Sequence, residues 1–144
     1  MIVLFISSLP CYTQDKNLIG GYRYMVFYKL KDFNSILIAE NALDCCTGNL
    51  ELLIPNTTDA SGEKHVPVVQ ADGAAVTVTV GSVEHPMLPA HYITCIVLET
   101  SLGYQKKNLQ PGEKPVARFV LAEGEHAVAA YEYCNLHGLW KADA

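Results

Sequence analysis

A series of short strand signals separated by turns limits what residues 66–133 can fold into. Valine and threonine alternate over Val76–Val80, which predicts a strand with one apolar and one polar face. Turn-forming residues recur about every ten positions, and no long helical period interrupts them. The other strand signals lie at residues 66–70, 92–99, 104–109, 116–122 and 127–133. The pattern predicts an all-β fold, an antiparallel sandwich of about seven strands.

The chain divides into four parts where its composition changes. Residues 1–24 show no clear period and are predicted to be an extension, and Met25 offers an alternative start. Residues 25–54 contain short apolar runs around turns, which predict a small lobe. Residues 55–62 are mostly polar and are typical of a linker, so the sandwich domain is expected to take residues 63–144.

Charge and cysteine content exclude several kinds of partner. The 144 residues carry 10 basic and 15 acidic side chains, a net charge of −5, which disfavours nucleic acid and anionic membranes. The apolar segment at residues 1–9 is too short to span a bilayer and lacks the features of a signal peptide. Five cysteines are an odd number and poor material for a disulfide framework, so we expect a cytoplasmic protein.

Four of the five histidines and one cysteine lie in contexts that suit metal ligands. Two of the histidines flank a Pro-x-x-Pro segment, which is too stiff for a helix and can present both imidazoles from one loop. A Cys-x-x-His pair falls where the last predicted strand ends, and the remaining histidine, His126, lies in an acidic turn and is interpreted as solvated. The candidate ligands are His65, His85, His91, Cys134 and His137.

Four imidazoles and one thiolate fit some metals better than others. Structural zinc takes four ligands in a closed tetrahedron, so a fifth donor has no place. Blue copper on a β-sandwich uses a cysteine and two histidines with a weak axial methionine, and no methionine follows Cys134. Square-planar imidazoles with an axial thiolate leave one octahedral position open, which suits iron. The Cys-x-x-His pair by itself leaves zinc, copper and iron open, including a cupredoxin-like electron-transfer protein.

Several short motifs between residues 63 and 142 are specific enough to compare with a known family. They are EKHVP at 63–67, GSVEHPM at 81–87, HYI at 91–93, LQPG at 109–112 and YEYCNLHGLWK at 131–141. Together they resemble the superoxide reductases of the desulfoferrodoxin and neelaredoxin family. The resemblance implies an immunoglobulin-like seven-stranded sandwich with one mononuclear iron (Fe²⁺/Fe³⁺) per chain. It also implies His65, His85, His91 and His137 as equatorial ligands and Cys134 as the axial ligand.

The resemblance further implies a reaction and roles for two charged residues. The family reduces superoxide by one electron to hydrogen peroxide, in defence against oxidative stress, without making dioxygen. Lys64 matches a lysine that supplies positive charge near the site, and Glu63 matches a glutamate that closes onto the ferric iron after turnover. Backbone amides after Cys134 are expected to tune its sulfur. Without the flanking motif, Lys64 and Glu63 would be read as ordinary solvated side chains.

The N-terminal lobe departs from the desulfoferrodoxin pattern. That pattern holds a rubredoxin-like iron with a Cys-x-x-Cys and a vicinal cysteine pair, but Leu30 and Phe33 stand at the first pair and only Cys45 and Cys46 remain. We therefore predict a degenerate desulforedoxin-like lobe without metal, in which Leu30 and Phe33 pack where the metal would lie. Cys95, inside a predicted strand, is expected to be a small core residue.

A chain with one iron centre needs an external electron donor, which we expect to be a rubredoxin-like or flavin-linked protein. The family's habit of oligomerising predicts a homodimer or homotetramer. One further alternative is a family member that serves only as a non-catalytic immunoglobulin-like interaction module. The retained candidate ligands argue against that alternative.

Overall fold

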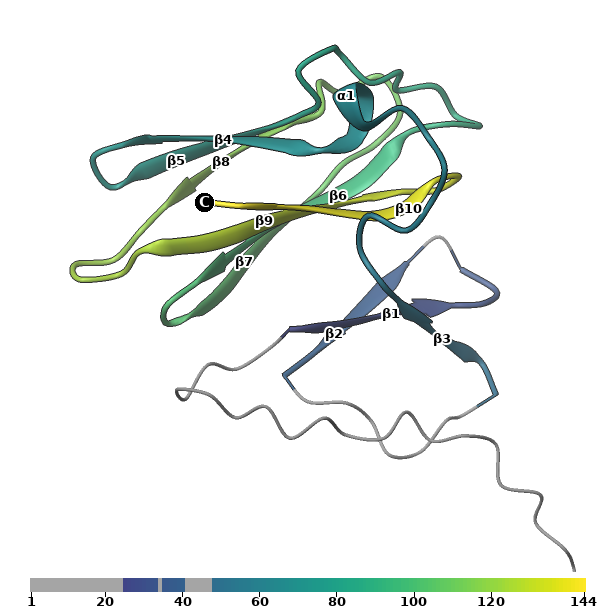
Figure 1. Cartoon of the computed structure of the whole chain (residues 1–144), viewed down its shortest axis with the longest axis horizontal. Helices are drawn as coiled ribbons and strands as arrows, with labels where there is room; N and C mark the ends of the chain where they lie inside the picture. The colour runs from purple at the N-terminus through teal and green to yellow at the C-terminus, as the bar shows by residue number, and fades with distance from the viewer. Residues whose placement is uncertain (1–24, 34, 41–47) are drawn as a thin grey trace, which may run out of the picture.

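The computed structural model describes residues 25–33, 35–40 and 48–144, and its strands form three stacked sheets (Figure 1). Two of the sheets form a sandwich, and the third belongs to the N-terminal lobe. The predicted extension at 1–24 and the pair Cys45 and Cys46 lie outside the described residues. Among the residues described, no helix has the length and apolar character needed to cross a membrane.

The sandwich has seven antiparallel strands, in line with the expected number of about seven, and six of them fall at the strand signals of the sequence. One sheet has the order β10-β9-β6-β7 and the other the order β4-β5-β8. Strand β10 falls in the segment after Cys134, where no strand was assigned from the sequence, and the other six lie within two residues of the predicted runs. The strands are β4 Pro67–Asp72, β5 Ala75–Val80, β6 Ile93–Thr100, β7 Gly103–Asn108, β8 Val116–Val120, β9 Ala127–Cys134 and β10 Gly138–Asp143.

The four-stranded sheet is the middle layer and has an apolar core on each face. One core lies between the two sandwich sheets and includes Val78 and Leu98, and the other faces the lobe and includes Val97 and Tyr131. Successive residues of a strand point to opposite faces, so a strand buried on both faces is apolar at consecutive positions. This explains the continuous apolar runs of β6 and β9, and it confirms Cys95 as a small core residue, 2% exposed.

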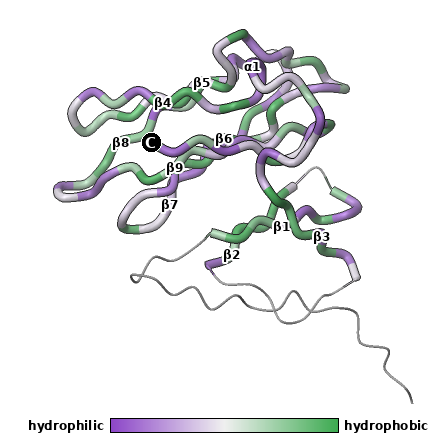
Figure 2. Tube along the Cα trace, viewed as in Figure 1, coloured by the Kyte–Doolittle hydropathy of each residue, from purple (hydrophilic) through white to green (hydrophobic). Residues whose placement is uncertain are grey.

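The N-terminal lobe is a three-stranded antiparallel sheet that packs on the middle layer. Strand β1 (Val26–Leu30) is central, between β2 (Ile36–Ala39) and β3 (Leu50–Leu53). The Phe27 ring contacts the Tyr131 ring of β9, with 4.6 Å between centroids. The lobe strands are largely coloured as hydrophobic in Figure 2. A sheet this small does not fold alone, so the packing of its apolar face on the sandwich stabilises it.

The prediction that Leu30 and Phe33 fill the lobe interior is wrong for Phe33. Phe33 lies in the turn after β1 and is 65% exposed, and Leu30 is only half-buried. The buried apolar side chains are instead Phe27 and Ile36. Both lie at strand positions that face the sandwich, whereas a turn residue has no sheet face to pack against.

A single helical turn, α1 (Gly62–His65), begins inside the segment predicted to be a linker. Four residues are too few to produce a helical period, so the sequence pattern gave no sign of it. The turn lies at the end of the sandwich where the β5–β6 loop and the β9–β10 turn also meet (Figure 1).

Candidate metal centre

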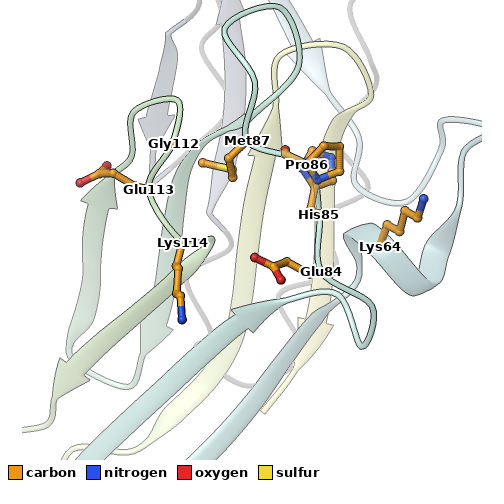
Figure 3. Close-up of a pocket in the computed structure, with 8 residues that line it drawn as sticks. All are labelled: Lys64, Glu84, His85, Pro86, Met87, Gly112, Glu113 and Lys114. Atoms are coloured by element: carbon orange, nitrogen blue, oxygen red, sulfur yellow. Dashed lines mark hydrogen bonds between the residues drawn. The ribbon is translucent and has the colours of Figure 1, made fainter.

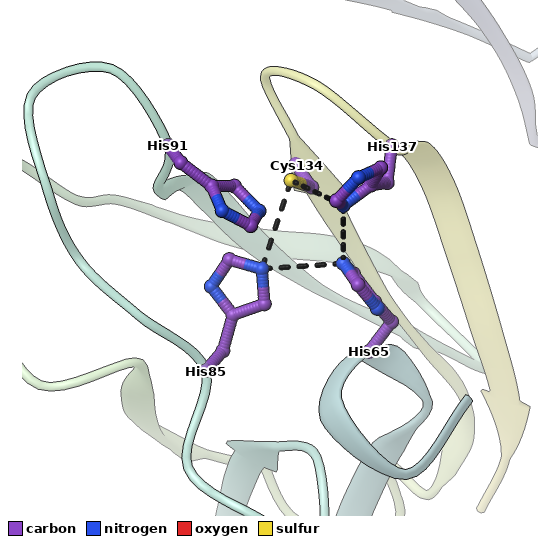
Figure 4. Close-up of side chains that lie close together, drawn as sticks. All are labelled: His65, His85, His91, Cys134 and His137. Carbon is purple, nitrogen blue, oxygen red and sulfur yellow. Dashed lines mark hydrogen bonds between the residues drawn. The ribbon is translucent and has the colours of Figure 1, made fainter. Parts of the chain in front are cut away.

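The five candidate ligands, far apart in the sequence, converge at one end of the sandwich (Figure 4). His65 comes from α1, and His85 and His91 come from the loop between β5 and β6. Cys134 is the last residue of β9, and His137 lies in the turn before β10. Their ligand atoms all lie within 4.8 Å of one another, so one metal ion can reach all five.

The four imidazoles form a closed square. Each ring stands nearly perpendicular to the next in the order His65, His85, His91, His137 and back to His65, with centroids 4.6–4.9 Å apart and interplanar angles of 73–88°. The Nε2 atom of His65 lies 3.2 Å from His85 Nε2 and 3.0 Å from His137 Nδ1. Four nitrogens in a square, each about 2.1 Å from a metal, would be separated by about 3.0 Å along each edge.

The sulfur of Cys134 lies close to the axis of this square. Its Sγ atom is 3.7 Å from His85 Nε2 and 3.8 Å from His137 Nδ1, and these two histidines occupy opposite corners. Cys134 is fully buried, so the sulfur marks the core side of the square and the other side faces the surface. A closed zinc tetrahedron does not use this donor set. The set fits an ion that takes four nitrogens in a plane and one axial thiolate.

Met87 lies in the loop that also carries His85 and His91. Its sulfur is 3.4 Å from the Ile93 amide, which donates a hydrogen bond to it. Met87 therefore takes part in local backbone contacts of the β5–β6 loop.

Hydrogen bonds fix which nitrogen each histidine turns to the centre. His65 and His85 each donate a Nδ1 hydrogen bond to a backbone carbonyl oxygen, at 2.8 and 2.6 Å, which leaves both Nε2 atoms free as ligands. His91 Nε2 is buried without a protein partner, and His137 turns Nδ1 inward. The square thus presents three Nε2 atoms and one Nδ1 atom.

The protonation states of these groups suit a cation. Burial lowers the pKa of His65 and His91 and lowers that of His85 to about 4, so these three imidazoles are neutral at pH 7. Burial raises the pKa of the Cys134 thiol, although backbone N–H groups of His137 and Leu136 act in the opposite direction. These amide contacts support the expectation that the backbone tunes the sulfur. A bound metal ion would displace the thiol proton and keep the sulfur anionic.

The two charged candidates lie on α1, beside His65. Glu63 and Lys64 are both exposed. Burial is the first cause that lowers the pKa of His91, followed by the neighbouring His137 ring and then by the Lys64 ammonium, so the Lys64 charge is felt at the corner opposite His65. Lys64 and His85 also line a pocket of about 440 Å³ (Figure 3). The structure thus brings Lys64 to the site, while the catalytic roles of both residues stay predictions.

Comparison with known proteins identifies the family. Residues 57–143 match the family model described as "Desulfoferrodoxin". The chain belongs to the desulfoferrodoxin family. Two desulfoferrodoxins, from Clostridium acetobutylicum and Syntrophotalea carbinolica, are 42% and 46% identical to it over 75% and 70% of this chain, and over 86% and 79% of their own lengths. The superoxide reductase structure from Treponema pallidum matches with a TM-score of 0.74 and 36% identity, covering 84% of this chain and 100% of that one.

Two further residues position ligands, and neither is among the site residues predicted from the sequence. Trp140 stacks on His65, with 4.9 Å between ring centroids and a 21° interplanar angle, and its indole Nε1 donates a hydrogen bond to the His137 carbonyl at 3.2 Å. Gly81 has φ 76° and lies where an added Cβ would be 2.5–2.8 Å from three carbonyl oxygens, two of which belong to α1. Both residues lie inside the family motifs, Gly81 in GSVEHPM and Trp140 in YEYCNLHGLWK, and this position was the one sign in the sequence of their importance.

A buried carboxyl group lies behind the Cys134 ligand. Glu132 precedes Cys134 by two residues on β9, so both side chains point to the same face of the sheet, into the sandwich core. Glu132 is 0% exposed, neither carboxyl oxygen has a hydrogen-bond partner, and burial raises its pKa well above the ordinary value. We therefore expect this carboxyl group to be neutral at neutral pH.

The variant Glu132→Gln is expected to lose a pH dependence of stability that the parent protein has. Between the unfolded pKa and the raised folded pKa the folded state binds one more proton, so parent stability falls by about 1.4 kcal/mol per pH unit as the pH rises. Thermal unfolding of both proteins from pH 5 to 8 measures the difference between their slopes of stability against pH. The other titratable groups contribute equally to both proteins, so their contributions cancel in this difference. The matched exposed change Glu123→Gln should leave the slope as it is. Parallel pH profiles for Glu132→Gln and the parent would show that Glu132 is ionised.

Proposed function

We propose that this chain is a superoxide reductase, which adds one electron and two protons to superoxide to give hydrogen peroxide. The observation that carries this proposal is the square of four imidazoles with one buried cysteine sulfur on its axis. That arrangement supplies five donors and leaves the surface side of the square free for a small anion. The family match and the Treponema pallidum superoxide reductase, so named, support the same reaction.

The metal is one mononuclear iron per chain, held by His65, His85, His91, His137 and Cys134. When bound, iron supplies a redox change between Fe²⁺ and Fe³⁺ and one vacant position, which suits the reduction of a small oxygen species. The chain's own contribution is to orient the imidazoles and to keep those of His65, His85 and His91 neutral. It also keeps the thiolate on the side away from solvent.

Lys64 is proposed to attract superoxide, and Glu63 to approach the iron after turnover. The protein carries a net charge of −5, so an anionic substrate needs local positive charge. One lysine at about 7 Å in water-like dielectric contributes about 0.6 kcal/mol, a few-fold in local anion concentration. Lys64 is exposed beside the site and its charge reaches His91, which supports this role.

The variant Lys64→Ala is expected to slow the encounter with superoxide a few-fold at low salt and to flatten its salt dependence. Glu63→Ala should leave the fast encounter largely intact, because removal of a negative charge does not weaken the attraction. Lys106→Ala removes the same charge from the exposed strand β7 and is the matched control. Rates come from pulse radiolysis at several ionic strengths. An unchanged Lys64→Ala rate at low salt would rule out the steering role.

The finer details are proposed on the same basis. The electron donor is a rubredoxin-like or flavin-linked protein, and the chain acts in the cytoplasm as a homodimer or homotetramer. We also propose the division into a metal-free lobe at 25–54, a linker at 55–62 and an iron-binding domain at 63–144. In favour of the metal-free lobe, Leu30 and Phe33 stand where the family pattern has its first cysteine pair, and two thiolates cannot hold that iron.

Metal analysis and product analysis test the function together. The purified protein should contain about one iron per chain, and the reduced protein should convert superoxide to hydrogen peroxide stoichiometrically without dioxygen. Copper in place of iron would indicate the cupredoxin-like alternative. A protein that holds iron but yields dioxygen, or no peroxide, would exclude the reductase function. The second result would favour the alternative of a non-catalytic immunoglobulin-like interaction module.

A further inference from the structure

Two exposed leucines lie beside metal ligands. Leu88 is 62% exposed and Leu136 is 59% exposed, and both lie next to candidate ligands. The backbones of Leu88 and His91 exchange two hydrogen bonds of 2.9 Å, so exposed Pro89 and Ala90 form the tip of a tight turn. We call Leu88, Pro89, Ala90 and Leu136 the ligand-loop patch.

The two halves of the patch are tied together by Asn135. Its side-chain Nδ2 donates a hydrogen bond to the Ala90 carbonyl at 3.0 Å, and its Oδ1 accepts one from the Tyr92 amide at 2.9 Å. The Asn135 amide also donates to the Tyr92 carbonyl at 3.2 Å. The turn that carries Leu88 and the turn that carries Leu136 therefore hold a fixed relation to each other.

The patch adjoins the part of the imidazole square that is nearest the surface. His91 and His137 are neighbours in the square, with 4.8 Å between ring centroids, and both are half-buried, whereas His65 and His85 are 2% exposed. Leu88 pairs with His91 and Leu136 precedes His137. Residues 85–98 and 133–140 contain no Asp, Glu, Lys or Arg, so the patch and its surroundings in the sequence are uncharged.

We propose that the ligand-loop patch is the docking surface for the electron donor, a small electron-transfer protein with apolar side chains around its redox group. This inference rests on the proposed function, because each turnover leaves a ferric centre that must regain one electron. The donor loses that electron, and the next superoxide takes it up with two protons. Leu136 is bonded directly to His137, and Leu88 is hydrogen-bonded to the backbone of His91, so both leucines connect to ligands of the site.

The size and character of the patch favour this occupant over a second copy of the chain. Stable dimers bury about 1,200–2,000 Å² or more, whereas electron-transfer encounters fall below about 1,200 Å². Four small or medium side chains suit the smaller class. Their lack of charge favours contact through apolar surface, with specificity from shape.

Three rates measured on the iron-loaded protein test the proposal. The double variant Leu88→Gln/Leu136→Gln keeps the net charge and the ligands, and Leu102→Gln is the matched control, since Leu102 is 72% exposed in the β6–β7 turn, far from the site in Figure 1. Reduction of the ferric protein by reduced rubredoxin or by a reduced flavodoxin should slow about ten-fold or more in the double variant only. Reduction by ascorbate, and oxidation by superoxide, should not change.

Binding measured without turnover gives a second readout. Zinc-substituted rubredoxin titrated into the zinc-loaded, ¹⁵N-labelled protein should shift amide signals of residues 87–92 and 135–138, and the double variant should lose these shifts. The proposal is overturned if the double variant is reduced as fast as the parent, or if Leu102→Gln slows equally. It is also overturned if neither donor protein reduces the parent faster than ascorbate does. Failure of the superoxide reaction itself would instead remove the proposed function.

Discussion

Replacing Cys134 with serine is expected to abolish superoxide reduction and to remove the visible thiolate-to-iron absorption band of the oxidised protein. Cys134 Sγ lies on the axis of the imidazole square and receives backbone N–H groups of Leu136 and His137. A serine hydroxyl is not ionised under these conditions, so the axial anion is lost while the four imidazoles remain. We expect activity to fall by at least about a hundred-fold, as for loss of other direct participants in catalysis.

The optical spectrum, iron content and peroxide yield of the two proteins provide the measurement. Cys95→Ser is the matched control, because Cys95 is also buried in the middle sheet but lies in the core that faces the lobe. It should cost about 1–2 kcal/mol of stability through a buried hydroxyl and leave the band in place. An absorption band that persists in Cys134→Ser, or disappears equally in Cys95→Ser, would contradict the axial assignment.

The variant Gly81→Ala is expected to lose most of its iron and about 2–4 kcal/mol of folding free energy. An alanine Cβ would lie 2.5 Å from the Val83 carbonyl oxygen and 2.7 and 2.8 Å from those of Lys64 and Glu63. The φ of 76° adds strain for any residue with a Cβ. Relief requires the α1 turn to move, and α1 carries His65.

The matched control is Gly73→Ala, at a positive φ of 58° where an added Cβ meets nothing within 4 Å. It isolates the backbone strain, which we expect to cost about 1–2 kcal/mol without loss of iron. Denaturant unfolding and iron titration of both variants provide the measurement. Equal effects of the two substitutions would show that the close packing of α1 against Gly81 has no separate importance for the site.

The identity of the candidate ligands could be predicted from the sequence because each lies in a short local motif. Prolines adjoin His85 and lie close to His91, and Cys134 and His137 form a Cys-x-x-His pair, so the features that mark these residues lie within a few positions of them. The strand pattern of the sandwich was equally local, since alternation and turn residues are read over a few positions. Two local features were missed: α1 is a single turn, too short for an apolar period to repeat, and β10 lies within the segment that the ligand motif occupies.

Other features depend on which segments meet, and the sequence could not supply them. Phe27 rather than Phe33 fills the lobe core because β1 lies against the middle sheet, and that contact joins segments about a hundred residues apart (Phe27 and Tyr131). Likewise, the stacking of Trp140 on His65 joins two ends of the domain. The residues next to a packing side chain in the sequence do not show which distant side chain it will contact in the fold.

The sequence by itself determined the candidate donor set of this protein, four histidines and a cysteine, and the all-β class that holds it. Only the tertiary structure decided the order of the imidazoles around the square, the nitrogen that each presents and the side on which Cys134 lies. The physical reason is that residue type and spacing fix which atoms can bind a metal. The directions from which those atoms arrive are set by α1, two loops and the end of β9, which meet only after the sheets have packed.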